Sequence, residues 1–293
     1  MTDYGVLFRE LAVPRLAGTP NHQKVRETLI RELEARGFTV ERHAFSGRPA
    51  HALFGTPREI QGVNLIAHRP SGRPTVRPSV WLVAHYDSKG QPISMLVRLL
   101  GFLLLVLGVA ALVVDVVTAV VALAIGLALV AQNRVTDNSP GAVDNASALI
   151  TILMAIDQLP RDAAVGVVFP DAEEYGLVGA RALARDRAEL FRDAAIINLD
   201  GMDDVGPATV FAHRPGPVGI AVARALEANR WRWLPVLVDG IALRRVGREC
   251  ATILKGGVAT MLIVHTPHDT VDRVRLDGAA RVAAGLARVL RAG

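Results

Sequence analysis

Residues 80–87 read Val-Trp-Leu-Val-Ala-His-Tyr-Asp, an almost continuous apolar run that ends in a histidine and an aspartate. A short apolar run of this kind, from Val80 to His85, predicts a strand in the interior of a sheet, buried on both faces. In open α/β sheets, ligands bind beyond the carboxyl ends of the strands. The stretch therefore predicts both a central strand and the edge of the sheet where chemistry takes place.

Strands and helices alternate outward from this stretch. Apolar periodicity and composition predict helices at 21–37, 145–159, 177–184, 218–228 and 276–290. Short β-rich runs predict further strands at 38–45, 63–68, 164–169, 194–199, 209–212 and 257–264. Such alternation predicts an α/β fold, a three-layer α/β/α sandwich around a mostly parallel central sheet.

Composition excludes some classes of function. The net charge of +5 comes from arginines scattered along the chain, with no basic stripe interleaved with aromatic residues, so we expect no nucleic-acid partner. Cys250 is the single cysteine, which rules out an intrachain disulfide and fits a reducing compartment. No basic segment followed by an apolar one occurs in the first thirty residues, so we expect no secretory signal. The oligomeric state stays open.

Histidines and carboxylates follow the predicted strands. The residues at these positions are His85 and Asp87, Glu173 and Glu174, Asp200, and His265, with Asp144 at the head of a helix. Zinc accepts imidazole nitrogen and carboxylate oxygen, and a zinc pair needs one carboxylate that bridges both ions. Taken singly, each of these pieces is common in structural roles, such as an Asp-Gly turn or a solvated helix start. Their value lies in their joint occurrence.

Five blocks in this order resemble the M28 family of zinc peptidases. They are Ala84-His85-Tyr86-Asp87, Gly141-Ala142-Val143-Asp144-Asn145-Ala146-Ser147, Ala172-Glu173-Glu174-Tyr175-Gly176-Leu177-Val178-Gly179, Asn198-Leu199-Asp200 and His265-Thr266-Pro267-His268-Asp269-Thr270. Pro14-Arg15, Gly18-Thr19 and Asn64-Leu65-Ile66-Ala67 also resemble the family's N-terminal part. The resemblance covers nearly the whole chain except one hydrophobic insert.

The resemblance implies a role for each of these side chains. His85, Asp144 and Asp200 would hold one Zn²⁺, and Asp144, Glu174 and His265 a second, so that two Zn²⁺ ions bind per chain. Glu173 would be the general base and then the proton donor to the leaving amine. Asp87 would accept the second ring N–H of His85 and fix its tautomer. These roles describe hydrolysis of a peptide substrate.

Two stretches depart from the family pattern. Val143 stands where many members have a second aspartate, and a valine side chain cannot bind metal. The stretch Val246–Cys250 does not resemble the run that contributes to the family's substrate pocket. Three nearby arginines could bind a substrate carboxylate, although solvated surface arginines are the more common case. They are Arg244, Arg245 and Arg248.

The hydrophobic insert separates His85 from Asp144. Leu99 to Ala131 contains one ionisable residue, Asp115, and no polar face. One straight helix of this length would extend about 50 Å, beyond a hydrocarbon core of about 30 Å, and would place His85 and Asp144 on opposite sides of a bilayer. We therefore predict two helices, Ile93–Val114 and Val116–Gln132, that form a transmembrane hairpin contacting the lipid bilayer through residues 93–132. A greasy cap or dimerisation arm on a soluble enzyme is the alternative.

Charge at the ends of the insert predicts its orientation. Lys89, Arg98 and Arg134 flank its base and Asp115 lies at its tip, so the positive-inside rule places the catalytic domain in the cytoplasm, at the membrane. Residues 1–91 and 135–293 would then form a single zinc peptidase domain, with residues 92–134 inserted as the hairpin.

The predicted function is that of a membrane-anchored zinc aminopeptidase. A carboxypeptidase or a glutaminyl-cyclase-like member of the same family is an alternative. A catalytically silent membrane scaffold is another, but a scaffold could have lost Glu173 or a metal ligand, and none is lost.

Overall fold

The computed structural model describes residues 2–50, 56–69, 77–234 and 236–291. The strands are β1 (Thr39–Gly47), β2 (Ile60–His68), β3 (Val80–Val83), β4 (Val165–Phe169), β5 (Ala195–Met202), β6 (Ala208–Arg214), β7 (Asn229–Trp231) and β8 (Glu249–Lys255). The helices are α1 (Tyr4–Leu11), α2 (Pro20–Ala35), α3 (Met95–Ala111), α4 (Val116–Ala131), α5 (Ser147–Asp157), α6 (Val178–Asp186), α7 (Ala188–Phe191), α8 (Pro217–Ala225), α9 (Asp239–Leu243), α10 (Val258–Ile263) and α11 (Asp277–Arg291). Three short helical turns are η1 (Ala142–Ala146), η2 (Glu173–Tyr175) and η3 (Val271–Arg273).

Within the described residues, the strands form one eight-stranded sheet in the order β1-β2-β4-β3-β5-β8-β6-β7. The central pairs β4–β3, β3–β5 and β5–β8 are parallel. The pairs β1–β2, β2–β4 and β6–β8 are antiparallel, and β6–β7 is parallel. The expected α/β fold is confirmed, but the sheet is mixed, and its parallel part is the centre, formed by β4, β3, β5 and β8.

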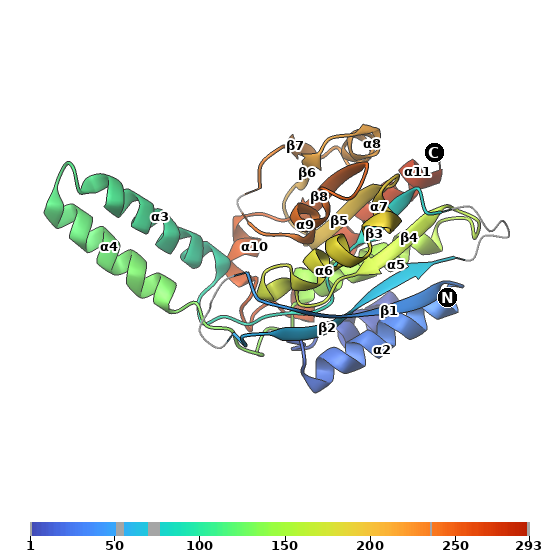
Figure 1. Cartoon of the computed structure of the whole chain (residues 1–293), viewed down its shortest axis with the longest axis horizontal. Helices are drawn as coiled ribbons and strands as arrows, with labels where there is room; N and C mark the ends of the chain where they lie inside the picture. Colours follow the sequence, from blue (N-terminus) through green and yellow to red (C-terminus); the bar gives the residue numbers. More distant parts are fainter. Residues whose placement is uncertain (1, 51–55, 70–76, 235, 292–293) are drawn as a thin grey trace.

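Helices cover both faces of the sheet (Figure 1). Side chains alternate across β3, so Leu82 packs into a core with Leu29 of α2 and Leu149 of α5. Trp81 points to the opposite face, where its ring lies 5.5 Å from that of Phe191. Residues 80–83 are thus buried on both faces, as the apolar run predicts.

The prediction for residues 257–264 is wrong. They form helix α10, and the strand in this part of the chain is β8, formed by residues Glu249–Lys255. Gly257 begins the helix, with its backbone N–H donating to Thr260 Oγ1 at 2.9 Å. Val258 and Leu262 of α10 are exposed. A short apolar run does not by itself distinguish a strand from a helix, and here the run includes exposed apolar side chains of a helix.

Helices α3 and α4 form an antiparallel pair that projects from the body of the protein, here called the arm (residues 95–131; Figure 1). Asp115 ends the turn between them and begins α4, accepting the backbone N–H groups of Val117 and Thr118 at 3.2 and 3.1 Å. Glycines let the helices approach closely, since a Cβ on Gly126 would lie 3.0 Å from the carbonyl oxygen of Gly101.

The membrane-spanning part of the hairpin prediction is not supported. Across the described ranges of the chain, none of the helices combines the length and the apolar character required to traverse a bilayer. The division of the chain into a peptidase domain and an inserted segment of residues 92–134 stays a prediction.

Candidate metal centre

The central strands bring the predicted site residues to one edge of the sheet. His85 follows β3, Glu173 and Glu174 lie in η2 just after β4, and Asp200 lies in β5. Because β4, β3 and β5 are neighbouring parallel strands, their carboxyl ends meet at the same edge. Asp144 reaches this edge from η1, just ahead of α5.

His265 approaches the site by an unexpected route. It follows helix α10 and not a strand, and its backbone lies in the left-handed region with φ of 65°. Non-glycine residues seldom adopt this conformation, and it tends to occur at functional sites.

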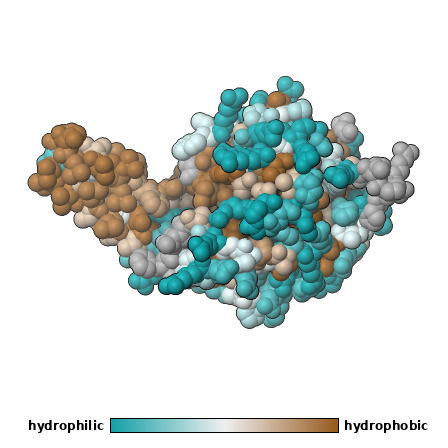
Figure 2. All heavy atoms as spheres, in the orientation of Figure 1, coloured by the Kyte–Doolittle hydropathy of each residue, from teal (hydrophilic) through white to brown (hydrophobic). Residues whose placement is uncertain are grey.

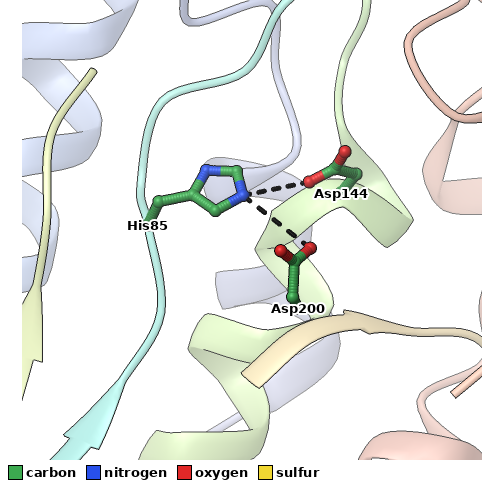
Figure 3. Close-up of side chains that lie close together, drawn as sticks. All are labelled: His85, Asp144 and Asp200. Atoms are coloured by element: carbon green, nitrogen blue, oxygen red, sulfur yellow. Dashed lines mark ion pairs between the residues drawn. The ribbon is translucent and has the colours of Figure 1, made fainter. Parts of the chain in front are cut away.

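These residues form two groups that share Asp144. In the first group, His85 Nε2 lies 3.1 Å from Asp144 Oδ1 and 4.0 Å from Asp200 Oδ1 (Figure 3). In the second, His265 Nε2 lies 2.9 Å from Asp144 Oδ2 and 3.2 Å from Glu174 Oε2. Potential ligand atoms within each group lie within 4.8 Å of one another. The five predicted ligands are thus brought together in the two sets that the resemblance implies.

The donor set fits zinc. Both groups offer imidazole nitrogen and carboxylate oxygen, and all five side chains are buried. Asp144 Oδ1 and Glu174 Oε1 are buried and have no hydrogen-bond partner in the described structure. Buried carboxylate oxygens are rarely left without a partner, so these two atoms are suited to bind cations. Their role as ligands stays a prediction.

The local charge also calls for cations. Burial and the nearby Asp144 carboxylate raise the pKa of Asp200 to about 7. Burial, with further repulsion from Glu174, Asp239 and Asp200, raises the pKa of Glu173 well above its usual value. Cations would relieve this crowding of negative charge.

The backbone at Asp144 is fixed by the carboxylate of Asp269. Asp269 is fully buried and accepts the backbone N–H groups of Val143 at 2.7 Å and of Asp144 at 3.1 Å. Asn145 ties the same turn to β5, donating to the carbonyl of Leu199 and accepting from the N–H of Gly201. Val143 therefore contributes through its backbone, as its apolar side chain requires.

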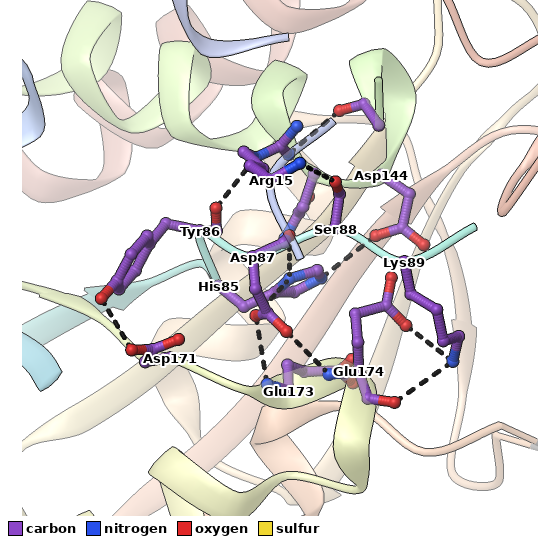
Figure 4. A network of polar contacts seen from close by, with 12 residues as sticks. Arg15, His85, Tyr86, Asp87, Ser88, Lys89, Asp144, Asp171, Glu173 and Glu174 are labelled. Atoms are coloured by element: carbon purple, nitrogen blue, oxygen red, sulfur yellow. Dashed lines mark hydrogen bonds and ion pairs between the residues drawn. The ribbon is translucent and has the colours of Figure 1, made fainter. Parts of the chain in front are cut away.

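Asp87 contacts both His85 and η2. Its two carboxylate oxygens accept the backbone N–H groups of Glu173 and Glu174, both at 3.1 Å (Figure 4). His85 Nδ1 lies 3.2 Å from the backbone carbonyl oxygen of Asp87 and 3.4 Å from its carboxylate. Both the main-chain carbonyl and the carboxylate of Asp87 therefore face Nδ1 of His85, and the carboxylate also fixes the backbone of Glu173 and Glu174.

Sequence reasoning missed two cations at the site. Lys89 Nζ lies 2.9 Å from Glu174 Oε2. Burial alone would raise the pKa of Glu174, but His265 and Lys89 lower it to about 2. Arg98, in the first turn of α3, places Nη2 3.3 Å from His265 Nδ1. Both residues were noted only as positive charges flanking the insert, since no local pattern links them to residues so distant in the sequence.

Arg15 joins the two loops that carry His85 and Asp144. Its fully buried guanidinium donates to the carbonyl oxygens of Tyr86, Pro140 and Gly141 (Figure 4). The Pro14-Arg15 pair noted in the sequence is the one signal that could have indicated this role.

Sequence reasoning also missed Asp239. It begins α9, is buried, and neither of its carboxylate oxygens has a hydrogen-bond partner among the described residues. Burial raises its pKa to about 8, with further repulsion from Asp87 and Asp200. A buried, unpaired carboxyl beside a metal centre is typical of a binding or catalytic site.

The stretch Val246–Cys250, which does not resemble the family's substrate-pocket run, leads into the start of β8. Glu249 and Cys250 begin β8, and Glu249 accepts the backbone N–H of Gly219 at 3.0 Å. The three arginines of this region are exposed, which agrees with solvated surface side chains: Arg244, Arg245 and Arg248.

Comparisons with known proteins show the family of the chain and agree with this fold. Residues 64–290 match the family model described as Peptidase family M28. A zinc aminopeptidase from Bacillus subtilis superposes with a TM-score of 0.66 at 12% identity, covering 99% of this chain and 93% of that chain. A Bacteroides thetaiotaomicron glutaminyl cyclase gives 0.66 at 16% identity, covering 99% and 97%. An aminopeptidase from Aneurinibacillus sp. strain AM-1 gives 0.64 at 13%, covering 98% and 92%. No curated protein matches the chain.

Proposed function

The chain belongs to peptidase family M28, and from the geometry of its site we propose that it is a two-zinc aminopeptidase acting on the N-terminal bond of peptides. One observation carries the proposal: the two histidine–carboxylate groups share Asp144, as two neighbouring metal ions require of a bridging ligand. Metal ions bound there would polarise a substrate carbonyl and acidify a water molecule.

Glu173 is the proposed proton carrier. It is buried at the site, and Asp87 fixes its backbone through the hydrogen bond to its N–H group. A carboxyl whose pKa lies above the usual range holds a proton more readily at neutral pH, which suits a group that takes a proton from water and passes it to the leaving amine. Glu174, with its pKa lowered to about 2, stays ionised and suits the role of ligand.

Asp239 favours an amine-bearing substrate. A buried carboxyl without a partner is suited to accept hydrogen bonds from the free α-amino group of a peptide. The fold likeness to glutaminyl cyclases keeps a cyclase-like activity as the second candidate.

The test is an assay of the purified full-length protein with zinc on free and N-acetylated aminoacyl anilides, beside a substrate with N-terminal glutamine. We expect hydrolysis of the free forms and none of the acetylated forms. Glu173→Gln should lower kcat by about 10³-fold with its zinc retained, whereas Glu189→Gln, an exposed glutamate, should behave as the unaltered protein. Full activity in Glu173→Gln would refute the assignment.

We also propose that the arm docks on a lipid bilayer. Most of its exposed side chains are apolar, among them Val106, Val113 and Val117 at 67%, 90% and 72% exposed. Figure 2 shows this surface as a continuous apolar projection next to a largely polar body. An apolar surface on all sides suits lipid better than a partner that would cover one face.

The orientation of the docked protein is also a proposal. Arg134 is exposed at the base of the arm and Asp115 lies at its tip, so by the positive-inside rule we expect the catalytic body to face the cytoplasm. Protease digestion of sealed right-side-out membrane vesicles from expressing cells tests this. We expect the catalytic body to be protected until detergent opens the vesicles. Digestion of the body in intact vesicles would place it outside the cell.

A further inference from the structure

The base of the arm is tied to the metal ligand His265. Gln91, just before α3, donates its backbone N–H to the carbonyl of His265 at 2.6 Å. The side chain of Gln91 also accepts from Arg98 and donates to Asn133, which follows α4. Gln91 and Asn133 are buried. Both ends of the arm thus meet in one hydrogen-bonded network whose last member, Arg98, touches the ring of His265.

The contact between Arg98 and His265 conflicts with metal binding. A guanidinium has only donors, so its hydrogen bond to Nδ1 uses the lone pair of that nitrogen. A neutral ring then carries its proton on Nε2, the nitrogen that faces Asp144 and Glu174. A metal ion needs the Nε2 lone pair, which moves the proton to Nδ1, where it would face the N–H groups of Arg98.

The other histidine has no such conflict. His85 Nδ1 faces the carbonyl oxygen of Asp87 at 3.2 Å, an acceptor that places the ring proton on Nδ1. The Nε2 lone pair of His85 is then directed at Asp144 and Asp200. At His85 the partner of Nδ1 leaves Nε2 free to bind a metal ion. At His265 the partner of Nδ1 is Arg98, which favours a proton on Nε2.

Lys89 does not obstruct the second half in the same way. It pairs with Oε2 of Glu174 and leaves Oε1 without a partner. Glu174 can therefore bind a cation through Oε1 while Lys89 stays in place. Arg98 is the residue that must move.

We propose that Arg98 competes with a metal ion for His265, so that the half-site of Asp144, Glu174 and His265 binds zinc more weakly than the half-site of His85, Asp144 and Asp200. Arg98 is a positioning residue carried by the arm, and its release from His265 completes the metal centre. The inference rests on the proposed function, since it takes both half-sites to bind zinc.

Zinc titration of the metal-free full-length protein, followed by calorimetry against a competing chelator, tests this. The unaltered protein should bind two zinc ions with affinities that differ about ten-fold or more. In Arg98→Ala and Arg98→Gln the weaker site should tighten about ten-fold, and the stronger site should not change. Arg134→Ala removes an exposed arginine at the other end of the arm and should match the unaltered protein.

The sign of the change separates this role from a structural one. General damage to the site weakens metal binding, so unchanged or weakened second-site affinity in both Arg98 variants would overturn the inference while two bound zinc ions left the proposed function standing. Absence of zinc binding in every protein, with the folded state retained by circular dichroism, would overturn the proposed function as well.

Discussion

Oδ2 of Asp144 lies 2.9 Å from Nε2 of His265, although the two residues are far apart in the sequence and reach each other from different elements. The other oxygen of the same carboxylate lies 3.1 Å from Nε2 of His85. Asp144 is therefore the point at which the two halves of the site meet, and its position depends on Asp269 and Asn145 behind it.

Replacing Asp144 should disable both half-sites. Asp144→Asn removes the charge that both proposed zinc ions share, and we expect at most one weakly held zinc ion and a loss of kcat/KM of about 10³-fold or more. Elemental analysis after dialysis and an anilide assay measure the two effects. The exposed residue change Asp162→Asn serves as the control. Two tightly bound zinc ions in Asp144→Asn would contradict the bridging role.

Asp87→Asn should separate positioning from metal binding. The amide keeps one acceptor oxygen, so one of the two backbone N–H groups of Glu173 and Glu174 loses its partner. We expect kcat to fall about 10- to 100-fold with KM and zinc content nearly unchanged. Loss of zinc without a change in kcat per bound zinc would show instead that Asp87 acts through His85.

The metal-free protein should lose stability as pH rises from 5 to 8. Folding raises the pKa of Asp200 to about 7 and of Asp239 to about 8, so the folded state keeps these protons where the unfolded state has released them. Stability is then highest below the ordinary carboxyl pKa and falls as pH rises through the folded values. His85, whose pKa the surrounding carboxylates raise despite burial, acts in the same direction.

Urea unfolding in the presence of a chelator, at pH 5, 6, 7 and 8, measures this slope. In Asp239→Asn the free energy of unfolding should fall less between pH 7 and 8. Excess zinc should stabilise the protein most at pH 8, because bound metal favours the ionised ligands. A free energy of unfolding that rises between pH 5 and 8 without metal would contradict the crowding of buried carboxyls at this edge.

Charged residues on the arm should abolish lipid docking. Val106→Glu with Val113→Glu places two carboxylates on the apolar surface, and we expect co-sedimentation with phospholipid vesicles to weaken about ten-fold or more. Val205→Glu changes a half-exposed valine on the body and should leave vesicle binding unchanged. Equal sedimentation of the arm variant and the unaltered protein would argue against lipid as the partner of the arm.

The sequence was most informative where local patterns coincide with the sheet. The apolar run at 80–85 predicts the buried strand, and the residues that end β3, β4 and β5 meet because parallel neighbours end at one edge. Asp144 and His265 do not follow a strand, and only the order of the five motif blocks indicated that they belong to the same site. Asp115 is compatible with the turn of the arm because its carboxylate accepts two N–H groups of α4, although no glycine or proline stands there.

What could not be predicted depends on tertiary contacts. Residues 257–264 resemble a strand because helix α10 exposes apolar side chains such as Val258. Asp239 lies in an unremarkable Val-Asp-Gly stretch, and only burial beside other carboxyls makes it unusual. Arg98 resembles a charge that flanks an apolar helix, and its contact with His265 arises from the way the arm joins the body.

Anomalous scattering at the zinc absorption edge, from a crystal of the full-length protein soaked in zinc, tests the shared metal centre most directly. The account predicts two peaks on either side of the Asp144 carboxylate, one contacted by His85 and Asp200 and the other by Glu174 and His265. Zinc bound elsewhere with no peak beside Asp144 would contradict it.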